Sequence, residues 1–559
     1  MFNDSDFVWY TPESRKFMQG DYLLPEERLG ERAWAIIQTA VAELGAACPP
    51  DFVQVFGEGL KRGWCSLSTP IWFNFGTDRG LPISCYNTHM DDTFDSLMGE
   101  AHAEMSVMSK YGGGTSTCYT PVRGRNSPIR GGRNGTSMGT IHFASHHQSM
   151  IRTSSQGSAR RGSLGGYWSV RHPDLNEVLG IRSEGHPIQD KNFHFGITFD
   201  DAWMEEMRAG DKAKREVWGK VLTARKKHGE PYLLFEGAMN RGMPKWYKDA
   251  GLSISSSNLC TEVTPTSNAF ESFVCCLMSL NAIRYREWRG TRFARMCVYF
   301  LDAVISEFIR KAKAIRFMER PTRYAERHRS LGIGLFGWHD LLQSEMLSFD
   351  SPEAYRLNAE VSRYLQQETV AASEQMAKDY GEPEVCKGYG RRHALLQAIA
   401  PTKSSAFIIG QASEGVGLRE ANVVMEDKAK GKFVWWNPYL ERVLADRGVD
   451  TPAVRQQILL AGGSVQRLDC LNDHEKAVFR TAFEVPQLAI IQQAAQRQQF
   501  IDQGQSINVY IDPATPAKDV NRVHLAAWEL GLKTMYYQIG ENAAKTFARD
   551  LMSCTACEA

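Results

Sequence analysis

The sequence predicts an α/β or mixed α and β fold, and two patterns support this prediction. Apolar residues recur at helical spacing, with few helix breakers, at 203–229, 291–318 and 352–380. Short apolar runs such as FHFGITF and LLFEGAM suit buried strands. Helices that alternate with buried strands are typical of a sheet covered by helices.

The remaining segments differ in character along the chain. Residues 21–65 are expected to be helical, because LPEERLGERAWAIIQTAVAEL places charges between apolar residues at helical spacing. From about residue 66 to residue 200, Gly and Ser interrupt short segments, which indicates strand ends and loops. FIDQGQSINVYID indicates a helix end followed by a strand, and the polar terminus MSCTACEA is expected to be mobile.

Composition and charge argue against several classes of function. The chain has 559 residues, of which 43% are hydrophobic and 23% charged, as in ordinary globular proteins, and this length leaves the domain count open. A net charge of +1 gives no general bias toward nucleic acid or acidic membranes. There is no secretory signal pattern and no apolar segment near the roughly 20 residues of a membrane helix. We therefore expect a cytoplasmic protein with reduced thiols, no nucleic-acid partner and no membrane span.

The stretch SSSNLCTEVTPT places Asn258, Cys260 and Glu262 at alternate positions. In an extended strand or a loop tip, alternate residues point the same way. An amide, a thiol and a carboxyl would then converge on one face. This combination packs poorly in a core and suits a reaction centre.

A second cysteine pattern lies two residues from the end, where Cys554 and Cys557 form CTAC. A zinc site would need two more ligands, and none lies nearby in this tail. A dithiol that visits a site and exchanges with a disulfide fits better than incidental cysteines in a disordered tail. Such a dithiol needs an internal disulfide to reduce. It therefore draws attention to Cys85 and Cys275, which singly would be buried core cysteines.

Three further patterns leave alternatives open. Tyr536 and Tyr537 in KTMYYQ are either a strand with one ring buried and one exposed, or a stacked redox-active pair. PTKSSA at 401–406 either binds phosphate or caps an ordinary helix. Arginines in Gly- and Ser-rich loops either bind phosphate or are solvated charges. These are Arg123, Arg125, Arg130, Arg160 and Arg161.

Together these motifs resemble the large catalytic subunit of class I ribonucleotide reductase, in chain order from about residue 20 to the end. The matching motifs are SLSTP, Cys85 before DDTFDS, SKYGGG, SPIRGG, SQGSARRG, NLCTE, CCLMSLN, LGIG, PTKSS, TMYYQ and CTAC. The resemblance implies an α/β barrel of ten strands, in two antiparallel halves of five, with NLCTE at the tip of a central finger loop. It also implies a ribonucleoside-diphosphate reductase that makes 2′-deoxyribonucleotides by a thiyl-radical mechanism.

The resemblance assigns roles to the residues at this tip. Cys260 becomes a transient thiyl radical and removes the 3′ hydrogen of the substrate ribose. Glu262 acts as a base on the 3′ hydroxyl, and Asn258 forms a hydrogen bond with the substrate. One thiol and one base on one face agree with these roles.

The resemblance also assigns the reducing groups. Cys85 and Cys275 form the pair that donates electrons and ends as a disulfide. Cys275 is preferred over Cys276 because it lies six residues before Asn281, which is the spacing in the family. The tail pair, Cys554 and Cys557, reduces that disulfide and is itself reduced by thioredoxin or glutaredoxin.

Tyr536 and Tyr537 match the pair that passes the radical inward to Cys260. That pair belongs to class I, in which a separate small subunit makes the radical at its own metal site. We therefore expect a small-subunit partner, and no cofactor or metal held by this chain.

Nucleotide sites follow by resemblance as well. The expected substrate-phosphate residues are Thr69, Ser84, Pro401, Thr402, Lys403, Ser404 and Ser405. Lys403 departs from the small or acidic residue of the family pattern. A deoxynucleoside triphosphate or ATP is expected as effector at a homodimer interface. The effector residues would be Asp92, Arg123, Arg130 and Arg160, with Arg161 in place of the usual glycine.

The resemblance also divides the chain into three segments, and three other functions are considered. Residues 1–65 would be an N-terminal helical region without the ATP cone, and hence without inhibition by dATP through a cone. Residues 66–545 would form the barrel with helical insertions, and residues 546–559 would form a redox-active tail.

The alternatives are an adenosylcobalamin-dependent class II enzyme, an inactive nucleotide-binding homologue and a glycyl-radical reductase. YYQ favours class I over class II, the retained cysteines argue against an inactive homologue, and the C-terminus lacks a glycyl-radical motif. A viral source would place the protein in the host cytoplasm.

Overall fold

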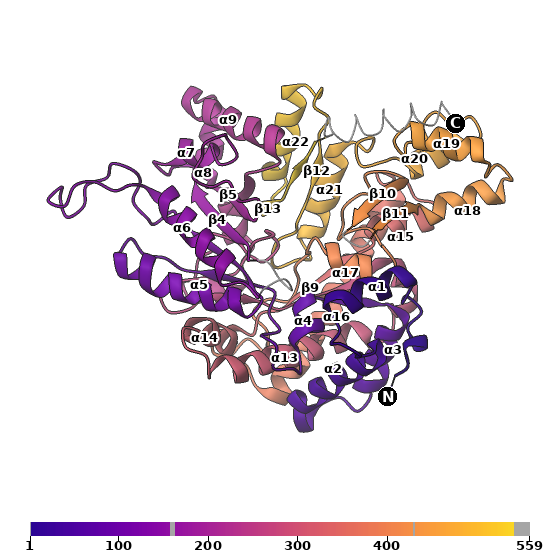
Figure 1. Ribbon diagram of the computed structural model, residues 1–559, viewed down its shortest axis with the longest axis horizontal. Helices are drawn as coiled ribbons and strands as arrows, with labels where there is room; N and C mark the ends of the chain where they lie inside the picture. The colour runs from indigo at the N-terminus through magenta and orange to yellow at the C-terminus, as the bar shows by residue number, and fades with distance from the viewer. Residues whose placement is uncertain (1, 157–161, 429–430, 541–559) are drawn as a thin grey trace.

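The computed structural model describes residues 2–156, 162–428 and 431–540, in which helices surround a central set of strands (Figure 1). Its first half-barrel contains five strands that pair in parallel and in chain order. These are β2 (Cys85–Thr88), β3 (Gly114–Cys118), β4 (Leu164–Ser169), β5 (Phe193–Phe199) and β6 (Tyr232–Phe235). Nearly all of their residues are buried, as expected for parallel strands covered on both faces.

The second half begins with a strand that crosses from one sheet to the next. β7 (Phe273–Cys275) continues through Cys276 into β8 (Leu277–Asn281). β8 pairs in parallel with β9 (Gly332–Phe336), and β1 (Cys65–Leu67) lies antiparallel on its other side.

Isolated parallel bridges extend this half beyond β9. Ile333 pairs with Gln397, and Ile399 pairs with Gln505. The chain after Gln505 reaches β12 (Val509–Tyr510), which pairs in parallel with β14 (Gln538–Ile539).

The two halves meet through antiparallel pairs at both edges. β7 pairs antiparallel with β2, and β13 (Thr534–Met535) pairs antiparallel with β6. Just after β13, the backbone N–H of Tyr536 donates to Ile507 O at 2.9 Å. The ring of strands is therefore closed, and closure removes exposed sheet edges. The expected barrel of two antiparallel halves is confirmed.

Helices cover the outside of the barrel (Figure 1). They are α1 (Pro12–Asp21), α2 (Leu29–Leu44), α3 (Phe52–Arg62), α4 (Thr69–Asn74), α5 (Ala101–Lys110), α6 (Thr140–Thr153), α7 (Leu175–Leu179), α8 (Asp201–Ala209), α9 (Lys212–His228), α10 (Glu236–Arg241), α11 (Lys245–Asp249), α12 (Tyr285–Trp288), α13 (Phe293–Ala312), α14 (Glu319–His328), α15 (Trp338–Ser344), α16 (Pro352–Tyr380), α17 (Lys403–Ile408), α18 (Pro438–Asp446), α19 (Pro452–Leu460), α20 (Asp473–Val478), α21 (Gln487–Gln498) and α22 (Ala517–Glu529). Within the described ranges, none of these helices is both long and apolar enough to cross a membrane.

Local sequence explains where several helices begin and end. The prediction for 352–380 is confirmed by α16, which Ser351 caps through its side chain and Gly381 follows. The helical prediction for 203–229 is confirmed, but by two helices, because Gly210 ends α8 in a left-handed conformation (φ 117°). Asp211 then caps α9 by accepting from Lys214 N.

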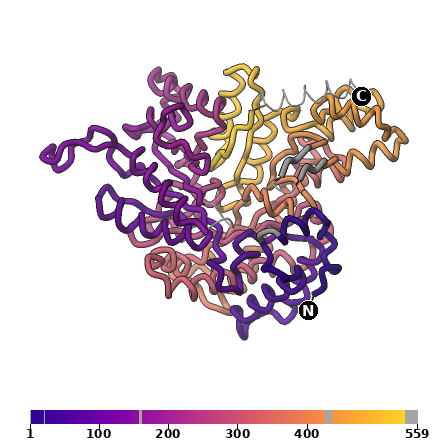
Figure 2. The backbone as a smooth tube through the Cα atoms, viewed as in Figure 1, coloured from indigo at the N-terminus to yellow at the C-terminus, as the bar shows by residue number. Residues whose placement is uncertain are grey.

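The core has one large cluster and several smaller ones. α13 is buried on almost every side, because it packs against α2, α3, α14 and α16 as well as β8. A separate small core joins α18, α19 and α20 beside the hairpin β10 (Val423–Lys428) and β11 (Gly431–Trp436). The tube in Figure 2 shows the segment between β3 and α6 extending away from the body.

Candidate active site

The segment between α11 and β7 is a loop held inside the barrel by contacts with both halves. From the first half, Ser116 Oγ donates to Ser257 O at 2.9 Å and Tyr167 Oη donates to Asn258 O at 2.5 Å. From the second half, Gly504 N donates to Glu262 O at 2.8 Å. We call residues 252–272 the finger loop.

The tip of the finger loop is a tight turn and is not extended. Asn258 N donates to Val263 O at 3.1 Å, and Val263 N donates to Asn258 Oδ1 at 3.0 Å. Thr261 adopts a left-handed conformation with φ 70°. The expectation of a loop tip is confirmed, but strand-like alternation of Asn258, Cys260 and Glu262 is wrong. A turn closed by Asn258 brings these residues together instead.

Glycines leave room for the loop and for the rings beside it. A Cβ at Gly504 would lie 2.7 Å from Thr261 O, closer than real contacts allow. A Cβ at Gly196 on β5 would lie 2.7 Å from the ring of Tyr167. Only glycine permits these approaches, so each position contributes directly to the shape of the site.

Glu262 is almost fully buried beside Cys260. Burial raises the pKa of Glu262 to about 7. Ser506 Oγ lies 2.6 Å from Cys260 O and 3.3 Å from Glu262 Oε2, so one hydroxyl joins both residues. The Asn258 amide is close enough to lower the pKa of Glu262, yet across the described residues its Nδ2 has no partner with hydrogen-bond geometry. The site therefore holds a carboxyl group whose pKa is close to neutral pH, and a buried amide donor that is available to a bound molecule.

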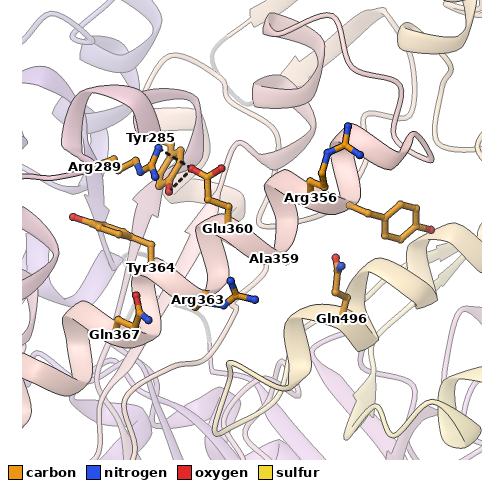
Figure 3. A pocket seen from close by; sticks show the side chains of 10 residues that line it. Tyr285, Arg289, Arg356, Ala359, Glu360, Arg363, Tyr364, Gln367 and Gln496 are labelled. Carbon is orange, nitrogen blue, oxygen red and sulfur yellow. Dashed lines mark hydrogen bonds and ion pairs between the residues drawn. The ribbon is translucent and has the colours of Figure 1, made fainter.

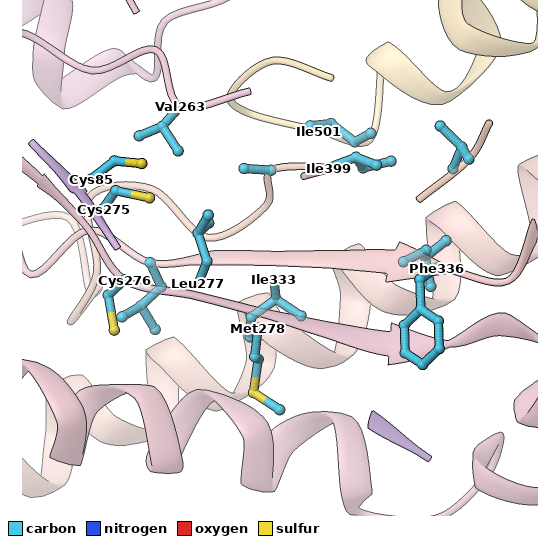
Figure 4. Packing of buried hydrophobic residues seen from close by; sticks show 14 of the residues in the cluster. Cys85, Val263, Cys275, Cys276, Leu277, Met278, Ile333, Phe336, Ile399 and Ile501 are labelled. Carbon is cyan, nitrogen blue, oxygen red and sulfur yellow. The ribbon is translucent and has the colours of Figure 1, made fainter. Parts of the chain in front are cut away.

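Cys85 and Cys275 are directly opposite each other on β2 and β7. Such antiparallel positions place Cβ atoms about 4.5–5.5 Å apart, close to the separation that a disulfide requires. Burial raises the pKa of the Cys275 thiol, and its hydrogen bond with Cys85 raises it further. Figure 4 shows these two sulfurs side by side, with Cys276 pointing the opposite way. Cys276 Sγ contacts Leu301 O on α13 at 3.6 Å.

Tyr536 and Tyr537 lie between β13 and β14, with ring centroids 4.3 Å apart. Burial raises the pKa of Tyr536 well above its ordinary value, and the adjacent Cys260 thiol, to which it is hydrogen-bonded, raises it further. The ring of Tyr232 on β6 lies 4.8 Å from that of Tyr536 and 5.1 Å from that of Tyr537. Arg225, fully buried on α9, donates to Tyr536 O at 3.0 Å. Phenols thus lead from the partly exposed Tyr537 to the thiol.

Together these groups could combine radical transfer, proton transfer and two-electron reduction in one site. The opposed thiols can supply two electrons, the carboxyl can accept a proton, and the phenols can carry a radical to Cys260. The family described as "Ribonucleotide reductase, barrel domain" matches residues 83–214, 210–388 and 383–538. The chain belongs to the ribonucleotide reductase family.

Individual relatives agree with this membership. A Frog virus 3 (isolate Goorha) protein, whose name proposes a ribonucleoside-diphosphate reductase large subunit, is 34% identical over 93% of this chain and 94% of its own length. The ribonucleoside-diphosphate reductase large subunit of Invertebrate iridescent virus 3 is 29% identical over 93% and 91%. The solved class Id ribonucleotide reductase alpha subunit of Actinobacillus ureae is 43% identical, covers 97% of this chain and 99% of that chain, and has a TM-score of 0.89. These matches favour class I over the cobalamin-dependent alternative.

In this reductase, the expected substrate-phosphate residues come from segments that the fold brings together. Ser66 Oγ donates to Ser405 O at 3.0 Å and Ser405 Oγ donates to Leu67 O at 3.4 Å, which joins β1 to α17, while Thr69 Oγ1 lies 3.0 Å from Tyr22 Oη. Ser84 Oγ is buried and has no hydrogen-bond partner among the described residues. Thr402 Oγ1 accepts from Gly415 N at 2.7 Å, so this hydroxyl has a structural partner, while the side chain of Lys403 is exposed.

Two of the expected effector residues contact each other, and a third lies exposed on the projecting segment. Arg123 Nε lies 2.6 Å from Asp92 Oδ2, while Arg130 is exposed on the projecting segment between β3 and α6. Several predicted residues lie outside the described part of the chain. These are Arg160, Arg161, Cys554 and Cys557.

Sequence reasoning missed residues that complete the site. Tyr167, His194 and Tyr232 face the finger loop or the tyrosine pair, as does Glu230 beside His194. Ser506 joins the loop to the second half. The available signal was glycine inside the strand segments GGGTSTC, LGGYWS and FHFGITF, since glycine within a strand marks a place where another group approaches closely.

A surface pocket of about 500 Å³ shares no residue with this site. Figure 3 shows it along α16, with Arg289, Arg356 and Arg363 among its lining residues. Arg289 pairs with Glu360 at 3.0 Å, and Tyr285 also donates to Glu360. The charge of this pocket is therefore partly neutralised, and the interior of the barrel remains the candidate active site.

Proposed function

We propose that this chain is the catalytic subunit of a ribonucleoside-diphosphate reductase, which receives its radical from a separate small subunit. The observation that carries the proposal is the series of Tyr537, Tyr536 and Cys260, with rings 4.3 Å apart and the inner phenol hydrogen-bonded to the thiol. The two rings pack against the cluster of Tyr167 and Tyr232, but packing alone does not require a phenol hydroxyl that is hydrogen-bonded to a thiol. This arrangement suits delivery of an oxidising equivalent from outside the barrel.

The radical steps transfer one hydrogen atom at a time. The radical of the small subunit takes the phenolic hydrogen of Tyr537, as one electron and one proton, and the resulting phenoxyl radical takes the phenolic hydrogen of Tyr536. The Tyr536 radical then takes the hydrogen of the Cys260 S–H bond, so that the phenol is restored and a thiyl radical remains. This thiyl radical removes the 3′ hydrogen of the substrate ribose.

Reduction then uses the groups around the thiyl radical. Glu262 accepts the 3′ hydroxyl proton while the 2′ hydroxyl takes a proton from the opposed thiols and leaves as water. Cys85 and Cys275 supply two electrons and become a disulfide; one of their hydrogens leaves in the water and the other is transferred to C2′. Glu262 returns its proton to the 3′ oxygen, and Cys260 returns its hydrogen to C3′ and is again a thiyl radical. Asn258 would hold a substrate hydroxyl, which is supported by its Nδ2, a buried donor without a partner in the described chain.

The remaining partners belong to the same proposal. Thioredoxin or glutaredoxin would reduce the tail pair, Cys554 and Cys557. Thr69, Ser84 and the 401–405 turn would hold the substrate diphosphate. A deoxynucleoside triphosphate or ATP would bind at a homodimer interface near Asp92 and Arg123.

The pH dependence of turnover tests the role of Glu262. Because its pKa is about 7 and the carboxylate is the proton acceptor, kcat should rise with pH to a plateau above about pH 7. Glu262→Gln should lower kcat by about 10²–10⁴-fold and remove this rise. Initial rates of CDP reduction from pH 6 to 8.5 would check both results.

The pH dependence of folding stability is the control for the Glu262→Gln variant. The folded state holds the Glu262 proton more tightly than the unfolded state, since 4.5 is the ordinary value of this pKa. Stability should therefore fall as pH rises from about 4.5 to about 7. Glu262→Gln lacks this loss, so its melting temperature at pH 8 should match or exceed that of wild type. Wild-type turnover by this variant would remove Glu262 from the mechanism.

The tail double variant Cys554→Ser with Cys557→Ser separates one reduction from many. The Cys85 and Cys275 thiols support a single turnover, but their disulfide then lacks a route to thioredoxin. We expect about one deoxynucleotide per active site in a quench-flow assay, and no further product. Full thioredoxin-driven turnover would exclude the tail from the pathway.

Reduction of CDP by the purified chain with dithiothreitol and an effector tests the whole proposal. One reaction contains the small subunit encoded in the same genome, and another contains adenosylcobalamin. Product only with the small subunit is expected. Product only with cobalamin would move the chain to class II, and nucleotide binding without product in either reaction would favour an inactive nucleotide-binding homologue.

A further inference from the structure

A histidine and a glutamate lie beside the outer tyrosine of the relay. Gly196 on β5 is paired with Tyr232 on β6. His194 and Glu230 lie two residues before these positions. His194 contacts Glu230, and its ring stacks on that of Tyr232 with centroids 6.2 Å apart. They come from the first half-barrel, whereas Tyr537 comes from the second.

The contacts form one connected series. Tyr537 Oη lies 3.0 Å from His194 Nδ1, and the same Nδ1 lies 2.9 Å from Glu230 Oε1. Glu230 Oε2 lies 2.7 Å from Arg182 Nη2 and 3.1 Å from Arg182 Nε. Arg182 also donates to the carbonyl of Phe193, the residue before His194. The Glu230 side chain is only 4% exposed, so water does not replace these contacts.

These contacts determine which atom carries the histidine proton. The Arg182 guanidinium donates to Glu230 Oε2, and a carboxylate paired with a guanidinium only accepts hydrogen bonds. His194 Nδ1 must therefore be the donor, and its N–H lies between Glu230 Oε1 and the Tyr537 oxygen. A donor on one side of that oxygen leaves its other side directed at the neighbouring phenols, Tyr536 and Tyr232.

We propose that His194, oriented by Glu230, is a positioning residue that anchors the phenol oxygen of Tyr537 at the entrance of the radical relay. This inference rests on the proposed function. Tyr537 is partly exposed, so its ring needs an anchor to stay 4.3 Å from Tyr536 while a partner approaches. When the Tyr537 radical takes the hydrogen of Tyr536, the oxygen that forms the new O–H bond is already hydrogen-bonded on its other side. His194 gives up no proton in this step.

Two substitutions separate this role from packing. His194→Leu keeps the bulk and removes the donor. His194→Asn places an amide nitrogen close to the position of Nδ1 and keeps the donor. His474→Leu, at an exposed position on α20, is the matched control. Each full-length variant is assayed with the small subunit for CDP reduction, and its melting temperature is compared with wild type.

The expected kinetic result is a change in kcat alone. His194→Leu should lower kcat by about tenfold, the effect of one lost hydrogen bond, and leave KM for CDP unchanged. His194→Asn should recover most of that loss, and His474→Leu should match wild type. Glu230→Gln, which keeps the shape but loses the charge, should show an intermediate kcat and serves as the second variant if His194→Leu does not fold.

A spectroscopic readout distinguishes anchoring from a purely structural effect. With 3-aminotyrosine at position 537, the trapped radical should show a different g tensor in His194→Leu by high-field EPR, and the wild-type value in His194→Asn. A wild-type kcat in His194→Leu, an effect on KM alone, or an unchanged EPR spectrum would overturn the inference. An unaltered chain that makes no product with its small subunit would overturn the proposed function as well, so the two failures are distinguishable.

Discussion

Cys260→Ser should abolish turnover while nucleotide binding persists. The O–H bond of an alcohol is much stronger than the S–H bond of a thiol, so the Tyr536 radical cannot remove the serine hydrogen. We expect kcat below about one ten-thousandth of wild type, which corresponds to a barrier at least about 5 kcal/mol higher. The substitution removes no backbone contact of the finger loop, because Ser506 and Gly504 hold that loop through carbonyl oxygens.

CDP reduction with the small subunit, together with calorimetric binding of the nucleotide, measures both parts of this result. Cys276→Ser is the matched control. Its side chain points to the other side of the strand, and a serine hydroxyl there can still donate to Leu301 O. The control should keep most activity. Appreciable turnover by Cys260→Ser would refute the thiyl role.

Tyr536→Phe should stop radical transfer without unfolding the protein. The ring remains in place against Tyr232 and Tyr537, but the hydroxyl that is hydrogen-bonded to Cys260 is lost. A phenyl ring has no O–H hydrogen to give and no accessible phenoxyl state. We expect activity below about one thousandth of wild type, equivalent to about 4 kcal/mol, and a melting temperature within a few degrees of wild type.

Two measurements check this variant, namely CDP reduction and EPR of the small-subunit radical, which should persist when substrate and effector are added. Tyr510→Phe is the matched control, because it removes a buried hydroxyl that donates to Leu418 O at 3.2 Å, outside the relay. It should cost about 1 kcal/mol of stability and leave turnover near wild type. An active Tyr536→Phe enzyme would mean that the radical reaches Cys260 by another route.

Much of the fold was predictable because its signals are local. The uninterrupted apolar spacing of 352–380 predicts α16, and FHFGITF predicts β5. The break at Gly210 was also readable, since Gly followed by Asp is a helix end followed by an N-cap. By contrast, Gln397 and Gln505 each form a single bridge to a segment far away in the chain, so no local pattern indicates which segments pair to complete the barrel.

The available chemical groups and their order can be read from the amino-acid sequence: the thiols, the carboxyl at the NLCTE tip and the adjacent tyrosines. Their arrangement in space depends on how the barrel folds. The Asn258 turn, the opposition of Cys85 and Cys275, and the contact of His194 with Tyr537 all depend on strand register and on residues far apart in the chain. Register is set by the packing of a closed sheet around a buried loop. That packing is a property of the whole barrel, which no single segment encodes.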